Sequence, residues 1–140
     1  MITTCTLFSS SLYSVVGAVS LSMAVTNLFS KHYLPFQEEA AGVKWEELEG
    51  GLQEVIITQL RLIGTGFLIS AIQLFSVALM QIVATQNRLN TLIPLYALLF
   101  IAALIRFNYK LHKQTGVNTP WKKSIVALLL VIAGMIFSWI

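Results

Sequence analysis

The stretch LQEVIITQLRLIGTGFLISAIQLFSVALMQIVA, residues 52–84, decides the fold of this 140-residue chain. It stays apolar for longer than the roughly 20 residues that an α-helix needs to cross a hydrocarbon core of about 30 Å. Three further apolar stretches occupy residues 7–29, 91–109 and 120–140. Together they predict an all-α, polytopic membrane protein, folded as one antiparallel bundle of four transmembrane helices.

The composition supports the same class independently. Hydrophobic residues make up 56% of the chain and charged residues 11%, with a mean hydropathy of +0.78. These values are hard to reconcile with a soluble domain of this length. Four spans leave no room for a second folded unit, so we expect a single domain in which residues 31–51 form an interfacial loop. The N-terminus lacks the basic segment of a cleaved signal peptide, which predicts a retained first span.

The distribution of Lys and Arg predicts the orientation, because cytoplasmic loops retain positive charge during insertion. The face that holds both termini and the turn 85–90 carries only Arg88. The other face carries Lys31, Lys44, Arg106, Lys110, Lys113, Lys122 and Lys123. We therefore predict a plasma or inner membrane protein with both termini outside and loops 30–51 and 106–123 in the cytoplasm.

The two cytoplasmic loops differ in charge. The second is wholly basic, whereas the first contains Glu38, Glu39, Glu46, Glu47 and Glu49. Two interpretations stay open: a latch between the loops, or two solvated loops that attract one another weakly. Surface ion pairs are worth only about 0–1 kcal/mol each, which favours the second.

Small residues recur every fourth position in the first span, at Ser10, Ser14, Ala18, Ser22 and Thr26. Small side chains let helices approach closely in lipid, where packing drives association. We expect this stripe to be buried within the bundle, with a homodimer contact as the alternative.

Polar residues gather on one side of the second span. At about 100° per residue, one sector holds the candidate polar or ligand site Glu54, Thr58, Arg61 and Thr65. We expect this sector to face protein or water, because an arginine exposed to lipid at the midplane costs about 2.5–3.5 kcal/mol on insertion scales. Arg61 has either a structural role, paired with Glu54 or extended toward the cytoplasmic end, or a role in binding an anionic ligand or headgroup. Gly64 and Gly66 should let a partner helix or ligand come close.

Basic and aromatic residues interleave where the third span ends and the fourth begins. This composition predicts a lipid-headgroup anchor, formed by Arg106, Tyr109, Lys110, Lys113, Trp121, Lys122 and Lys123. Nucleic acid is a poor alternative partner, because the patch is short and lies against the membrane. Thr119 is predicted to cap the fourth helix, with Pro120 at its first position.

Catalytic and cofactor motifs do not stand out in this sequence. It has no Asp, its two histidines lie in different loops, and its single cysteine, Cys5, excludes an intramolecular disulfide. A metal site built from His32, Glu38 and Glu39 would lack the spacing that fixes ligands on one helical face. We therefore expect no catalytic residues, no metal and no cofactor.

The first half of the chain has three parts in a fixed order. The first span is followed by an amphipathic connection that faces the cytoplasm, and then by a glycine-bearing span, from Leu52 to Gly66. This order resembles small four-helix membrane families such as the DoxX-like proteins, mainly over the first half of the chain. The resemblance implies a four-helix bundle and little about mechanism.

The sequence favours a protein that binds a lipid or apolar molecule, or an accessory subunit of a membrane complex. The alternatives are a membrane-embedded enzyme for a lipophilic substrate, with Glu54 and Arg61 as its polar centre, and a small dimeric transporter. Expected partners are membrane lipids, with a homo-oligomer or a larger complex left open.

Overall fold

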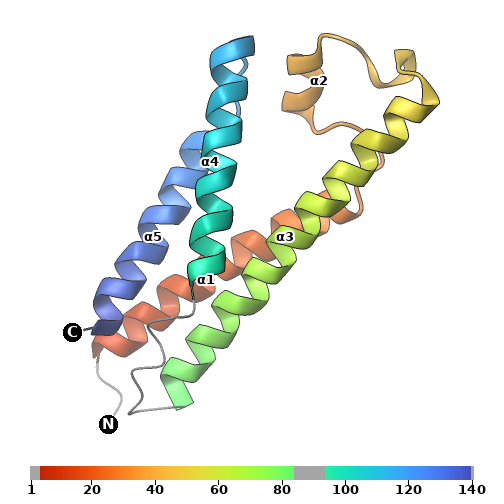
Figure 1. Ribbon diagram of the computed structural model, residues 1–140. Helices are drawn as coiled ribbons and strands as arrows, with labels where there is room; N and C mark the ends of the chain where they lie inside the picture. The colour runs from red at the N-terminus through yellow and green to blue at the C-terminus, as the bar shows by residue number, and fades with distance from the viewer. Residues whose placement is uncertain (1–3, 84–93, 140) are drawn as a thin grey trace.

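The computed structural model describes residues 4–83 and 94–139, which are helical and contain no strand. The helices are α1 (Thr4–Leu28), α2 (Pro35–Ala41), α3 (Gly50–Val83), α4 (Leu95–Thr115) and α5 (Trp121–Trp139), with a 3-10 turn at Trp45–Glu47. Figure 1 shows that α1 begins and α5 ends at the same end of the molecule. The all-α prediction is confirmed.

Three of these helices, α1, α3 and α5, are long and apolar enough to cross a membrane. In α4 the apolar part runs from Leu95 to Ile105, about 15 Å of helix, and basic residues follow from Arg106. The apolar part of the described α4 therefore covers only about half of a hydrocarbon core. The predicted start of the third span at residue 91 and the turn 85–90, with Arg88, lie outside the described residues.

Helix α1 packs most extensively against α3, and the two run antiparallel. The Ser10 hydroxyl donates to the Ala78 carbonyl oxygen at 3.0 Å, near the start of α1. At the other end of the contact, Gly64 lies against Leu28, the last residue of α1. Residues 50–63 of α3 consequently project about 20 Å past the end of α1 (Figure 1).

The predicted small-residue stripe on α1 is wrong as a buried face. Of its members only Ser10 is buried, while Ala18, Ser22 and Thr26 are exposed. A step of four residues turns an α-helix by about 400°, so a four-residue repeat drifts around the helix by about 40° per step. The buried face instead follows the helical period, through Ser9, Ser10, Tyr13, Val16, Gly17, Ser20, Ala24 and Asn27.

Helix α5 runs antiparallel to α1 and forms a hairpin with α4. The Ser9 hydroxyl donates to the Gly134 carbonyl oxygen at 2.7 Å. In the hairpin turn, Gly116 adopts a left-handed conformation with φ 73°, which closes α4. The Thr119 hydroxyl donates to the Asn108 carbonyl oxygen at 2.8 Å, so Thr119 ties the turn to α4 and does not cap α5. Helix α5 begins at Trp121, one residue later than predicted.

The buried apolar cluster lies in the half of the molecule where α1 begins and α3 ends. Its members are Tyr13, Val16, Leu74, Val77, Ala78, Ala97, Ile101 and Val131. Beyond this cluster, no residue is buried in 102–115 of α4 or in 50–59 of α3. Helices α3 and α4 therefore meet at one end and diverge toward the other, where α4 stays beside α5 (Figure 1).

A glutamine from α3 supplies the cap at the start of α4. The first N–H groups of a helix have no acceptor within it, and the residue before this helix is Pro94, whose side chain cannot accept a hydrogen bond. The Ala97 N–H donates to Gln73 Oε1 at 3.1 Å. This contact fixes the start of α4 against the middle of α3.

Candidate functional site

The polar sector of α3 lies on an exposed face of the helix. Glu54, Thr58, Arg61 and Thr65 are all exposed, so the chain itself does not cover them. The Thr58 hydroxyl donates to the Glu54 carbonyl oxygen at 2.8 Å, and the Thr65 hydroxyl donates to the Arg61 carbonyl oxygen at 2.9 Å. Both threonines thus use their hydroxyl protons within their own helix. The sector is a polar strip on one helix and encloses no pocket.

The ion pair considered between Glu54 and Arg61 is not formed, and no ion pair between a carboxylate and a Lys or Arg occurs within the described ranges 4–83 and 94–139. The two residues are seven positions apart, about 10 Å along the axis, which exceeds the reach of a direct helical pair. The acidic and basic loops are likewise not joined by an ion pair in those ranges, so the structure contains no closed latch.

Contacts between the helices place the cationic residues at one end of the packed core. Arg61 lies one turn before Gly64, in the part of α3 that projects beyond α1. On α4, Phe100 packs against Gly66, and Arg106 follows about 9 Å further along. Arg61 and Arg106 therefore lie at similar heights, each about one to two turns from the Gly66 and Phe100 contact.

Gly64 and Gly66 contact partner helices, as the sequence predicted. A Cβ at position 64 would lie 2.9 Å from the Leu28 backbone nitrogen, and one at position 66 would overlap the Phe100 ring. The two glycines therefore allow α1 and α4 to approach α3 on different sides. Phe100 also packs edge-on against Phe67, with ring centroids 5.1 Å apart.

The predicted headgroup anchor forms an ordered structure around Trp121 at the α4–α5 turn. The Trp121 ring packs edge-on against the Tyr109 ring, with centroids 5.4 Å apart, and Lys122 Nζ lies 5.7 Å from the Trp121 centroid. His112 also contacts this ring, at 6.1 Å, and its Nδ1 donates to the Val117 carbonyl oxygen at 2.6 Å. The cations of the anchor all remain exposed at this end: Arg106, Lys110, Lys113, Lys122 and Lys123.

The connection between α1 and α3, residues 29–49, corresponds to the interfacial loop predicted at residues 31–51. It contains two short elements, α2 and the 3-10 turn, separated by Gly42 at φ 66°. Trp45 packs edge-on against Tyr33 at 5.2 Å, and its carbonyl oxygen accepts a hydrogen bond from Gln53 Nε2 at 2.8 Å. These contacts attach the connection to the projecting part of α3.

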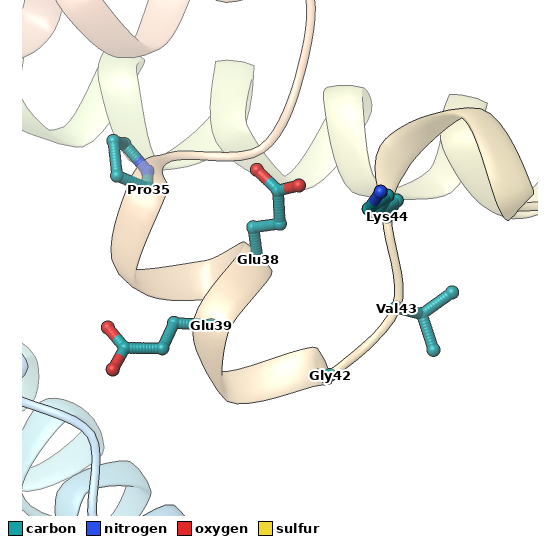
Figure 2. A pocket seen from close by; sticks show the side chains of 6 residues that line it. All are labelled: Pro35, Glu38, Glu39, Gly42, Val43 and Lys44. Atoms are coloured by element: carbon teal, nitrogen blue, oxygen red, sulfur yellow. The ribbon is translucent and has the colours of Figure 1, made fainter.

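A shallow hollow on this connection is lined by Pro35, Glu38, Glu39, Gly42, Val43 and Lys44 (Figure 2). Figure 2 shows the Glu38 and Glu39 carboxylates directed to different sides of α2, so they do not converge on one point. No group of three His, Cys, Asp or Glu side chains able to hold a metal ion occurs in the parts of the chain that the structure describes. The hollow therefore has charged side chains on its rim but no set of side chains that converge as ligands.

Two glutamines that the sequence analysis did not single out are important inside the bundle. Gln73 caps α4, and Gln81 is 2% exposed with neither side-chain atom hydrogen-bonded. Their amide side chains could have identified them in the sequence as interior residues, because polar side chains within an apolar helix usually face the bundle interior. Comparison with known proteins adds no assignment for these residues: no protein-family model, curated protein or solved structure matches the chain.

Proposed function

We propose that this chain is a four-span membrane protein that binds a lipid or another apolar molecule, or serves as an accessory subunit of a membrane complex. One observation carries the proposal: α3 and α4 diverge and bury no residue over 50–59 and 102–115. Large apolar side chains there include Val55, 52% exposed, and Phe107, 69% exposed. Apolar surface of this kind is stable only against lipid, an apolar ligand or another protein.

Native mass spectrometry of gently extracted protein tests this proposal, because it reports bound lipid, ligand and subunits together. We expect lipid adducts or a complex with a second chain. A bare monomer under conditions that preserve lipid adducts on a reference membrane protein would contradict both versions of the proposal.

The proposal includes α4 as the third of four spans, with both termini outside and the α4–α5 turn in the cytoplasm. The similar heights of Arg61 and Arg106 support it, because both cations then lie at one boundary and avoid the midplane. The proposed arrangement of four spans is the one that the resemblance to DoxX-like proteins implies. That resemblance implies no mechanism.

Cysteine labelling tests the span number and the orientation. In a Cys5→Ser background, Asn87→Cys should react with an impermeant maleimide on intact cells, whereas Gln114→Cys should react only after permeabilisation. Labelling of both variants from the same side would contradict α4 as a span. Labelling of Asn87→Cys only after permeabilisation, with Gln114→Cys labelled on intact cells, would overturn the orientation.

A further inference from the structure

We propose that the outward face of α4 is a binding site for an anionic phospholipid, with the phosphate on Arg106, Lys110 and Lys113. This inference rests on the proposed function and names the class of lipid. At about 100° per residue, these cations fall within a sector about 60° wide. The sector points away from Ala97 and Ile101, the buried residues of α4.

The same face changes from apolar to cationic along the helix axis. Before Arg106 it consists of exposed apolar residues, Leu95, Leu99, Ala102 and Ala103. From Leu95 to Ala103 this part extends about 12 Å, close to the depth of one leaflet in a 30 Å core. Acyl chains can lie along Leu95 and Leu99, while Ala102 and Ala103 add little bulk below the cations.

The charge on this hairpin has no compensating carboxylate. No Asp or Glu follows residue 54 in the sequence, and the cations of α4 and α5 form no ion pair within the described ranges. Arg106 and Lys110 repel one another as like charges four residues apart. An anion bound on the α4 face would reduce this repulsion.

Position favours a lipid headgroup as that anion. Phe107 and Tyr109 are exposed at the level where the cations begin, and Trp121 packs behind Tyr109. Aromatic side chains beside basic ones are typical of the headgroup region. The Thr119 and His112 hydrogen bonds hold the α4–α5 turn in one conformation, so this end of α4 has a defined backbone position.

A pair of matched double variants tests the site. Lys110→Gln with Lys113→Gln removes two charges from the α4 face, and Lys31→Gln with Lys44→Gln removes two from the connection on the same predicted side. All four lysines are exposed. Each purified protein is titrated with phosphatidylglycerol and with phosphatidylcholine in nanodiscs or by native mass spectrometry, and circular dichroism verifies the helix content.

We expect the unsubstituted protein to prefer phosphatidylglycerol and the Lys110 and Lys113 variant to bind it about 30-fold more weakly, at roughly a factor of 5 per lysine near a charged surface. The Lys31 and Lys44 variant should keep the preference. Equal losses in both variants would reduce the effect to general surface charge and overturn the site. Displacement of the lipid by millimolar inorganic phosphate would overturn the commitment to a lipid. Retained lipid without any headgroup preference would refute this inference alone, whereas retention of no lipid or partner at all would refute the proposed function.

Discussion

Gln73→Leu tests whether the interhelical cap fixes the start of α4. Gln73 Oε1 accepts the Ala97 N–H at 3.1 Å, and Ala97 is 0% exposed. Leucine has a similar volume but offers no acceptor, so the substitution leaves a buried donor unsatisfied. Such a donor costs about 1–3 kcal/mol, and loss of a helix cap costs about 0.5–2 kcal/mol. The range common to these two costs predicts that the free energy of unfolding falls by about 1–2 kcal/mol, a factor of about 5–30 in the unfolding equilibrium constant.

The unfolding free energy can be measured by titrating SDS into protein held in mild detergent, with helix content followed by circular dichroism. Gln59→Leu is the matched control, because Gln59 is exposed on the same helix and makes no hydrogen bond with its side chain. Both substitutions add the same apolar side chain, so their difference isolates the cap. Hydrogen exchange gives a local measurement, in which the Ala97 amide should lose protection. Equal unfolding midpoints and an unchanged Ala97 exchange rate would refute the reasoning.

Three further substitutions test helix contacts with the same unfolding assay. Gly66→Ala should destabilise by about 1–3 kcal/mol through overlap with the Phe100 ring, and Phe100→Leu should restore part of the loss; no rescue would contradict this packing. Ser9→Ala should cost about 0.6 kcal/mol because it removes a hydrogen bond between α1 and α5, whereas Ser11→Ala removes one within α1 and should cost less. The opposite order would count against the register of α1 and α5. Thr119→Val should cost about 0.5–1.5 kcal/mol by freeing the turn from α4, and an unchanged midpoint would show that the hydroxyl does not hold the turn.

Periodicity and composition were sufficient to predict the helical class and the spans within α1, α3 and α5. They also identified Gly64 and Gly66 as close-approach positions, because glycine in an apolar helix signals contact with a partner. The buried face of α1 was predicted wrongly for a geometric reason. A four-residue repeat drifts away from the 3.6-residue helical period over a long helix, and the buried side follows the helical period.

Features that depend on the relative position of two helices could not be predicted from one segment. The role of Gln73 follows from its position opposite Ala97, which is set by how α3 and α4 align. The exposure of Arg61 likewise follows from where α1 ends beside Gly64. Local sequence contains neither alignment, so it could not predict which face of α3 the other helices leave uncovered.

The unequal lengths of the helices determine how the protein responds to bilayer thickness. Helix α5 extends about 27 Å between Trp121 and Trp139, with little apolar length to spare. The longer α3 has its surplus at one end only, in the part that projects past α1. In a thicker membrane α3 can move part of this surplus toward the hydrocarbon while the Arg61 side chain extends back to the interface, whereas α5 cannot lengthen, so hydrophobic mismatch falls on α5. Helix α5, and not the longer α3, therefore sets the bilayer thickness that this protein matches best.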